Sequence, residues 1–215
     1  KLWDEAKEKK MNIIDATCPL VYEIHQEVKK LAKDGRRIIV VGDHGHDEVI
    51  AIANQVENAI VISSPKEALK LKKMKKAGVV SQSTQDIENV QDIINILMTK
   101  VFDLHFVNTI CFPTKRNHEQ IKDMAKINDI MIIIGSFTSA NSNRLTQLSL
   151  AINSQSFQVT DSKDLKPKWF KNKDNIGISA GASTPDYLIK DVKDTIENIY
   201  KEKLWDKEPT KLKLA

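Results

Sequence analysis

The strongest constraint on the fold is the regular alternation of short, β-branched apolar runs with longer amphipathic segments. The apolar runs predict strands at residues 12–15, 37–41, 59–62 and 78–80, then 104–107, 130–134, 157–159 and 175–178. Amphipathic helices are expected between them, at residues 21–33, 48–55, 66–72, 87–98, 118–127, 144–153 and 185–201. This alternation with short connections is typical of parallel sheets covered by helices on both faces. The predicted fold class is therefore α/β.

The two halves of the sequence repeat one another. Cys18 and Cys111 follow the first expected strand of each half, and they are separated by the same offset as Gly42 and Gly135. Such a repeat indicates duplicated domains. We expect two similar αβα domains at residues 12–102 and 103–203, preceded by a helical segment at residues 1–11 and followed by a tail at residues 204–215.

Composition limits the classes of partner. The chain has 215 residues and is 41% hydrophobic, enough to bury real cores. Lys and Arg total 33 against 29 Asp and Glu, so the net charge is only +4. Lysines such as those at 66, 70 and 73 fit a solvated helix face, which leaves a nucleic-acid-binding function weakly supported. No apolar run approaches a membrane span in length. We expect neither nucleic acid nor membrane as a partner.

The two cysteines are too few for the disulfide framework of a small secreted domain. Each stands between an expected strand and the helix that follows it. In parallel α/β sheets that is the edge where ligands bind, and a helix N-terminus favours anions and thiolates. Two inert thiols are the alternative. The equivalent repeat positions of Cys18 and Cys111 favour shared metal ligation.

Other polar loops also follow expected strands. Residues 43–48 hold two histidines and three acids, which suits metal ligation, phosphate binding or proton transfer, or else a polar helix cap with surface histidines. Residues 136–143 and 179–186 are rich in hydroxyls and amides; helix capping explains some of them, and the density favours an oxyanion or phosphate cradle. Residues 81–84 form a weaker version of the same pattern. We expect packing or surface roles for His25, His105 and His118.

A set of these motifs resembles one family. The set comprises DATCPLV at 15–21, GHDE at 45–48, SQST at 81–84, NTIC at 108–111, SANSNRL at 139–145 and AGASTPD at 180–186. In order and spacing it is similar to the LytB/IspH family of 4-hydroxy-3-methylbut-2-enyl diphosphate reductases, from about residue 1 to residue 201.

The resemblance implies three similar α/β domains in a pseudo-threefold, trefoil arrangement around a [4Fe-4S] cluster with one iron open to the substrate. Cys18 and Cys111 would be two of three cluster ligands. The third cysteine would lie in a first domain that precedes residue 1, so we expect the chain by itself to be inactive. Two electrons, from reduced ferredoxin or flavodoxin, and two protons would remove the substrate hydroxyl as water. The products would be isopentenyl and dimethylallyl diphosphates, in the final step of the non-mevalonate (MEP/DOXP) pathway of the cytoplasm or of a plastid-type organelle.

The resemblance also assigns roles to single residues. Glu48 would be the proton-relay acid. The substrate-binding residues would be His46, Ser83, Ser139, Asn141 and Ser183. The chain departs from the family pattern in four places: a serine replaces threonine at Ser83, an alanine replaces serine at 140, an aspartate replaces proline at 47, and Ile50-Ala51 replaces a glycine-containing segment. The alternative from another class is a noncatalytic phosphate- or anion-binding α/β module.

Overall fold

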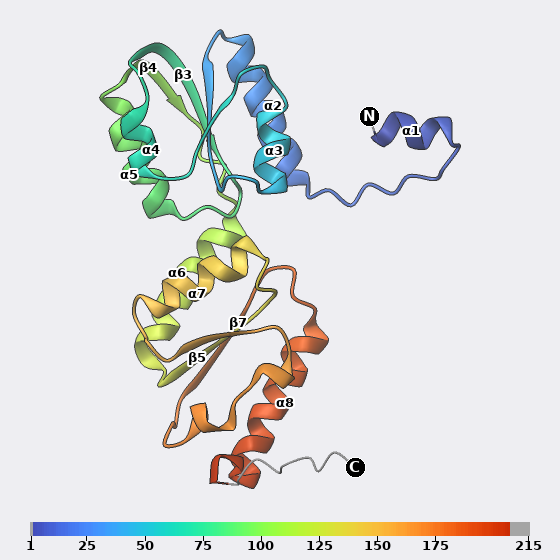
Figure 1. Cartoon of the computed structure of the whole chain (residues 1–215), viewed down its shortest axis with the longest axis vertical. Helices are drawn as coiled ribbons and strands as arrows, with labels where there is room; N and C mark the ends of the chain where they lie inside the picture. Colours follow the sequence, from blue (N-terminus) through green and yellow to red (C-terminus); the bar gives the residue numbers. More distant parts are fainter. Residues whose placement is uncertain (1, 207–215) are drawn as a thin grey trace, which may run out of the picture. The chain divides into compact units, whose positions relative to one another are not determined.

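The computed structural model describes residues 2–206 and divides the chain into two compact units. The first unit comprises Lys1–Ser83 and Asn89–Thr109, and the second comprises Thr84–Glu88 and Ile110–Ala215. Each unit holds a parallel sheet with helices on both faces (Figure 1). The predicted α/β class is therefore confirmed.

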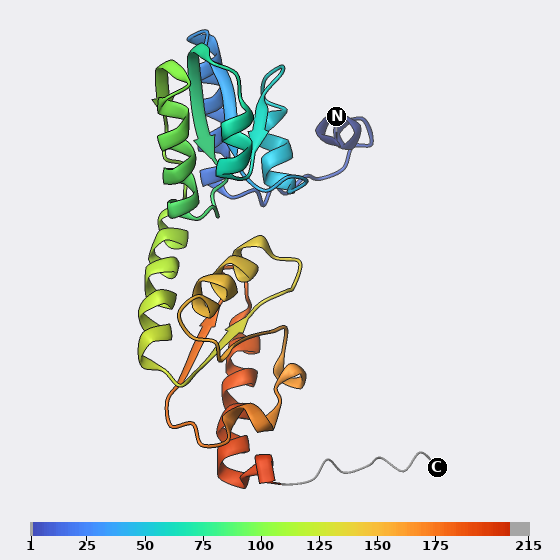
Figure 2. The same ribbon diagram turned by 60° about the vertical axis from the view of Figure 1, so that its left-hand side comes forward.

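The first unit contains a four-stranded parallel sheet in the order β2-β1-β3-β4. Its elements are α1 (Leu2–Glu8), α2 (Pro19–Lys33), β1 (Arg37–Val41), α3 (Asp47–Ala53), β2 (Ile60–Ile62), α4 (Pro65–Lys70), β3 (Met74–Ser81), α5 (Ile87–Met98) and β4 (Val101–Phe106). Helices α2 and α3 cover one face of the sheet and α4 and α5 the other, as Figures 1 and 2 show.

Both faces of this sheet are buried, which explains the continuous apolar runs of its central strands. Ile38 and Val40 of β1 pack with Val28 and Ile52 of α2 and α3. Residues of opposite parity on the strands, such as Ile39, are also fully buried. A strand flanked by helices on both sides has no polar face, so period-2 alternation is absent from the sequence here.

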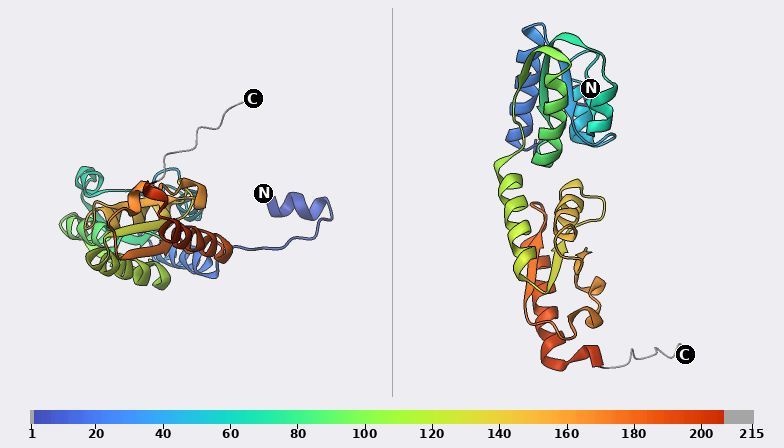
Figure 3. Two further views of the ribbon diagram at one scale, coloured as in Figure 1. Left: turned by 90° about the horizontal axis from the view of Figure 1, so that it is seen from below. Right: turned by 90° about the vertical axis from the view of Figure 1, so that its left-hand side faces the viewer.

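The second unit contains a three-stranded parallel sheet in the order β6-β5-β7. Its elements are α6 (Phe112–Ile127), β5 (Ile130–Ile134), α7 (Ala140–Leu150), β6 (Ser156–Val159), the 3₁₀ turns η1 (Ser162–Asp164) and η2 (Pro167–Phe170), β7 (Ile176–Ala180), α8 (Asp186–Glu202) and η3 (Leu204–Asp206). Helices α6 and α7 lie on one face of the sheet and α8 on the other, and both layers can be followed in Figure 3.

The core of the second unit also has two sides. Alternate residues of β5, Ile130, Ile132 and Ile134, pack with Phe170 and Ile196 on the α8 side. The intervening residues Met131 and Ile133 pack with α6 and α7. The strand order β6-β5-β7 matches the order β2-β1-β3 of the first unit. The internal repeat seen in the sequence is thus a repeat of sheet topology.

One predicted strand is absent, and another was assigned to the wrong half. Residues 12–15 form no strand: they have no strand to pair with, and Ile14 is 87% exposed. Residues 104–107 were expected to open the second half, but β4 pairs in parallel with β3 at the edge of the first sheet. Val107 continues that pairing by donating its N–H to the Val79 carbonyl oxygen. Apolar composition alone does not reveal which sheet an edge strand joins.

The boundaries at 12–102 and 103–203 and the trefoil arrangement stay predictions. Of the predicted tail, 204–206 form η3, and residues 207–215 lie outside the described part of the chain. Among residues 2–206, no helix combines the length and apolar character needed to cross a bilayer.

Two histidines are enclosed in these cores. His118 of α6 is 4% exposed, and no other described residue provides a hydrogen-bond partner for its Nε2 or for that of the half-buried His25 in α2. Burial lowers the pKa of His118, against the opposing charge of Asp86. Burial, followed by the charge of Lys29, lowers the pKa of His25. The prediction of packing or surface roles is consistent with these positions and with His105, which is exposed on β4.

Shortening a buried side chain in the core of the second unit should destabilise the protein. Ile132 is fully buried between β6, β7 and the α8 layer. Ile132→Ala should lower the free energy of unfolding by about 2–5 kcal/mol, because it removes buried methyl groups and leaves a cavity. Urea unfolding followed by circular dichroism measures this. Ile127→Ala, at a position 75% exposed, is the matched control and should change stability by less than about 0.5 kcal/mol. Equal losses in both variants would contradict the assigned core.

Stability should fall as the pH drops below the ordinary histidine range. An unfolded histidine titrates near 6.5, whereas the buried ring of His118 takes up a proton only at lower pH. Below 6.5 the unfolded chain therefore binds more protons, and stability declines until the lowered folded-state pKa is passed. His118→Gln should show a smaller decline between about pH 7.5 and about pH 5.5, measured by urea unfolding. An unchanged slope in His118→Gln would refute the prediction.

Candidate functional site

The loop after β1 is held against the end of β3. The N–H of Asp43 donates to Oε1 of Gln82 at 2.9 Å, and Gln82 is fully buried. Gly42 packs so closely that a Cβ there would lie 2.5 Å from Val49 Cγ2 and 3.2 Å from Gln82 Cβ. A side chain at position 42 would push this loop away from β3. The glycine and the glutamine thereby fix the path of the chain into α3.

This path places His46 and Glu48 at the start of α3. His46 is the N-cap residue, and its Nδ1 accepts the N–H of Glu48 at 3.2 Å. His44 lies outside this arrangement, because its Nε2 pairs with the carboxylate of Glu67 at 2.8 Å. The capping alternative thus holds for His46, and its bond directs the first turn of α3.

Glu48 and Ser83 contact one another. The N–H of Ser83 donates to Glu48 Oε1 at 2.7 Å, and the Ser83 hydroxyl donates to Glu48 Oε2 at 2.9 Å. Ser83 is 9% exposed and Glu48 is half-buried. An acid and a hydroxyl from separate motifs are therefore joined at the carboxyl edge of the first sheet.

Thr109 ties the loop after β4 to the same edge. Its hydroxyl donates to the Ser81 carbonyl oxygen at 2.5 Å and accepts the Ser81 N–H at 2.8 Å. The end of β3 is thus held by the ladder on one side and by Thr109 on the other. Neither Gln82 nor Thr109 was predicted as a site residue, although both occur within the quoted motifs directly after strands.

Cys18 and Cys111 occupy equivalent local positions. Each is the N-cap residue of its helix, α2 or α6, and each is followed by a proline in the first turn. Both thiols are free, and Cys18 is exposed. The Cys111 Sγ lies 2.9 Å from the Thr114 Oγ1 in the next turn of α6. Neither side chain accepts a capping hydrogen bond from its helix, and the contact with Thr114 is the one described for the Cys111 thiol.

The segment before Cys18 has its own local support. Asp15 accepts the N–H of Thr17 at 2.9 Å and a hydrogen bond from the Tyr22 hydroxyl. The hydrogen bond from Tyr22 lowers the pKa of Asp15, as do those from Thr17. Because Tyr22 belongs to α2, these contacts connect the DATCP segment to the helix that Cys18 begins.

Ser139 and Ser183 line one pocket at the carboxyl edge of the second sheet. The pocket has a volume of about 330 Å³. Its lining residues are uncharged: Gly135, Ser136, Ser139, Ser142, Thr160, Ser183, Thr184, Pro185 and Leu188. The N-termini of α7 and α8 begin beside it, at Ala140 and Asp186. Hydroxyls and helix N-termini without basic side chains suit an anion bound by hydrogen bonds.

Asn141 is placed differently. It is absent from the lining of this pocket, and its buried Oδ1 has no hydrogen-bond partner in the described part of the chain. Conversely, Ser142, Thr160 and Thr184 line the pocket without having been predicted as site residues. Thr160 follows β6, so the rule that polar residues after parallel strands face the ligand edge would have found it.

The two thiols are chemically suitable ligands of a metal cluster, but two are too few to hold one. Thiolates at helix N-termini are suitable iron–sulfur ligands. Among residues 2–206, no group of three or more histidine, cysteine or acidic side chains gathers into a metal site. Cys18 and Cys111 therefore qualify as single ligands to be completed by others.

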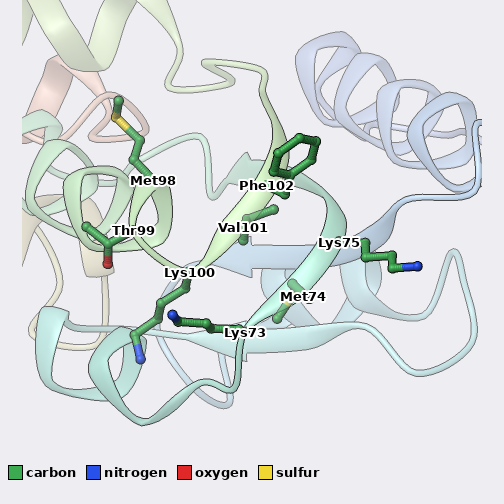
Figure 4. Close-up of a pocket in the computed structure, with 8 residues that line it drawn as sticks. All are labelled: Lys73, Met74, Lys75, Met98, Thr99, Lys100, Val101 and Phe102. Atoms are coloured by element: carbon green, nitrogen blue, oxygen red, sulfur yellow. The ribbon is translucent and has the colours of Figure 1, made fainter.

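A larger pocket lies at the opposite edge of the first sheet (Figure 4). It has a volume of about 510 Å³ and is lined by Lys73, Met74, Lys75, Met98, Thr99, Lys100, Val101 and Phe102. These residues begin β3 and β4 or end α5, so they belong to the amino edge of the strands. Lys100 is occupied with the Leu69 and Leu71 carbonyl oxygens. None of the predicted site residues is found there.

Proteins of known name are similar to this chain in sequence. A protein from Geotalea uraniireducens named 4-hydroxy-3-methylbut-2-enyl diphosphate reductase is 38% identical over 201 residues, covering 93% of this chain and 71% of that protein. A protein of the same name from Campylobacter lari is 36% identical over 199 residues, covering 92% and 72%.

Two solved structures match as well. The structure of (E)-4-hydroxy-3-methyl-but-2-enyl diphosphate reductase, described as the terminal enzyme of the non-mevalonate pathway, matches with a TM-score of 0.60 and 34% identity, covering 92% of this chain and 72% of that one. The structure of E-1-hydroxy-2-methyl-but-2-enyl-4-diphosphate reductase from Plasmodium falciparum matches with a TM-score of 0.82 and 28% identity, covering 90% and 62%. The sequence profile described as LytB protein matches residues 1–197. With its motifs carried on two parallel α/β sheets, this chain belongs to the LytB protein family.

Proposed function

We propose that the protein serves as a 4-hydroxy-3-methylbut-2-enyl diphosphate reductase. The reaction would take up two electrons and two protons, break the allylic carbon–oxygen bond and release the hydroxyl as water. Isopentenyl and dimethylallyl diphosphates would be the products, as the last step of the non-mevalonate pathway. The family membership supports the reaction class, and the contact between Glu48 and Ser83 is the structural observation that carries the proposal.

The Glu48–Ser83 pair is suited to proton delivery. Ser83 donates its hydroxyl proton to Glu48, which leaves the lone pairs of its oxygen for the hydroxyl of a substrate. When Glu48 is protonated the direction reverses: Glu48 passes its proton to Ser83 Oγ, and Ser83 passes its own to the departing oxygen. A general acid must lie within hydrogen-bond reach of its partner, and the 2.9 Å separation meets this requirement.

The diphosphate is assigned to the polar groups at the carboxyl edges. Ser139 and Ser183 would donate to its oxygens from the uncharged pocket, with compensation by the N-termini of α7 and α8. His46 and Asn141 are further proposed contacts, by resemblance. Asn141 carries the weaker support, because it is not among the residues that line that pocket.

Cys18 and Cys111 are proposed as ligands of a [4Fe-4S] cluster. When bound, the cluster would supply the electrons and a Lewis-acidic iron for the substrate hydroxyl. The proposed electron donor is reduced ferredoxin or flavodoxin, the proposed compartment is the cytoplasm or a plastid-type organelle, and no nucleic acid or membrane takes part.

The rival function is a noncatalytic module that binds phosphate or another anion. The uncharged pocket of the second unit would serve such a module equally well. The two functions differ in what else they require, because only the reductase needs the Glu48–Ser83 pair and the two thiols.

Iron binding should depend on both thiols. The chain, joined to the first domain of the Geotalea uraniireducens relative as a source of the third cysteine, is reconstituted anaerobically with iron and sulfide. We expect a brown, oxygen-sensitive protein, with most of the iron lost in Cys18→Ser and in Cys111→Ser. His105→Gln, which changes an exposed imidazole on β4, controls for adventitious iron and should retain it. A full complement of iron in both cysteine variants would rule out the ligand assignment.

Glu48→Gln should retain the cluster and lose turnover. The amide still accepts hydrogen bonds but cannot relay a proton, so we expect a decrease of at least about 100-fold in kcat. Reduction of the diphosphate substrate by dithionite and a viologen dye, followed optically, measures it.

Glu67→Gln is the matched control, since the Glu67 carboxylate accepts hydrogen bonds from the N–H and hydroxyl of Ser63, both at 3.0 Å. It should leave kcat within about threefold, because Glu67 bonds His44 and Ser63 and none of the proposed site residues. Normal turnover by Glu48→Gln would remove Glu48 from the relay and favour the noncatalytic module.

A further inference from the structure

The uncharged pocket of the second unit contains one hydroxyl that is almost completely enclosed. Ser142, in the first turn of α7, is 2% exposed, whereas Ser136 and Ser183 of the same pocket are exposed. A Cβ added at Gly135 would lie 2.1 Å from the Ser142 Oγ, and one added at Gly181 would lie 2.4 Å from it. The hydroxyl therefore occupies a slot between the ends of β5 and β7 that exists only because both positions are glycines.

From this slot Ser142 makes two hydrogen bonds to one atom. Its backbone N–H donates to Ser139 Oγ at 3.3 Å, which is the N-cap bond of α7. Its own hydroxyl donates to the same oxygen at 3.2 Å. Since a serine hydroxyl offers two lone pairs and one proton, both acceptor positions of Ser139 are taken by Ser142.

With both acceptor positions occupied, the Ser139 hydroxyl has only its proton left for a further hydrogen bond. Within residues 2–206, no acceptor for it is found, and Ser139 lines the pocket. A hydroxyl whose lone pairs were turned toward the pocket would repel an anion, whereas one whose proton is turned there can donate to it. We infer that Ser142 is a positioning residue that fixes the Ser139 hydroxyl as a donor to a phosphate oxygen.

The orientation of the Ser139 hydroxyl matters in this chain because few other groups of the pocket can attract an anion. The pocket has no basic side chain in its lining, so the orientation of each hydroxyl decides whether it attracts or repels an anion. Ala140 has no side-chain donor to add. The inference deepens the proposed function, because it assumes that the pocket takes the diphosphate of the substrate class.

The test is a double-mutant cycle on the chain itself, with inorganic pyrophosphate as the probe. Binding is followed by NMR titration of labelled protein, which also detects weak affinity. Ser139→Ala and Ser142→Ala should each weaken binding by about tenfold, the size expected for a hydrogen bond to a charged group. Because Ser142 acts through Ser139, the double variant should lose no more than Ser139→Ala alone.

Two further variants separate orientation from simple structural support. Ser149→Ala removes a fully buried hydroxyl of the same helix. This hydroxyl lies 2.7 Å from Ser156 Oγ and does not line the pocket, so the variant should leave pyrophosphate affinity unchanged. Ser142→Cys keeps a side chain in the slot with a weaker donor, so its affinity should lie between those of the unaltered chain and Ser142→Ala. Thermal unfolding shows whether each variant is folded at the titration temperature. If Ser142→Ala is unfolded there, the comparison is made with Ser142→Cys alone.

The outcomes separate this inference from the proposed function. If the unaltered chain binds pyrophosphate and Ser139→Ala weakens it, but the losses of Ser139→Ala and Ser142→Ala add, then Ser142 does not act through Ser139 and the inference fails alone. If Ser142→Ala and Ser142→Cys both bind normally, it fails in the same way. If the unaltered chain does not bind pyrophosphate, the diphosphate pocket is overturned and the inference with it.

Discussion

The pairing of two central parallel strands is the constraint on which each site depends. In the first unit β1 and β3 pair up to Val41 opposite Ser81, and the Gln82 N–H extends the ladder to the Val41 carbonyl oxygen at 2.8 Å. In the second unit β5 and β7 pair up to Ile134 opposite Ala180, and the Gly181 N–H reaches the Ile134 carbonyl oxygen at 2.9 Å. Parallel pairing aligns the carboxyl ends of both strands. The two polar loops of each unit therefore leave the sheet side by side.

From this shared geometry the two units have diverged. The first places Gln82 after β3, and its amide oxygen holds the loop that leads to Glu48. The second places Gly181 there, and the space of the absent side chain receives the Ser142 hydroxyl. One edge thus presents an acid–hydroxyl pair and the other an array of hydroxyls. The first suits proton movement and the second suits recognition of an anion.

Much of this could be predicted from the sequence, because the relevant signals are local. Strands β1 and β5 hold apolar runs that end at Gly42 and Gly135, and every helix expected between strands is present; the largest difference is at α6, which begins at Phe112 where residue 118 was expected. Residues 12–15 failed because a β-branched run forms a strand only where another strand offers hydrogen bonds. Strand β4 was assigned to the other half because an edge strand can join either neighbouring sheet, and its residues do not show that it pairs with β3. Strand pairing is decided by the tertiary structure, and amino-acid composition does not record it.

The sequence by itself determined the α/β class, the internal repeat and the motifs that mark the LytB protein family, since all three are recorded in residue order. Only the tertiary structure decided which hydroxyl meets which acid, that Asn141 is absent from the lining of the pocket that holds Ser139 and Ser183, and that Ser142 is enclosed between two glycines. The reason is physical. Residue identity sets what a side chain can donate or accept, but strand register and close backbone packing determine which lone pairs are already occupied, and therefore which proton remains for a ligand.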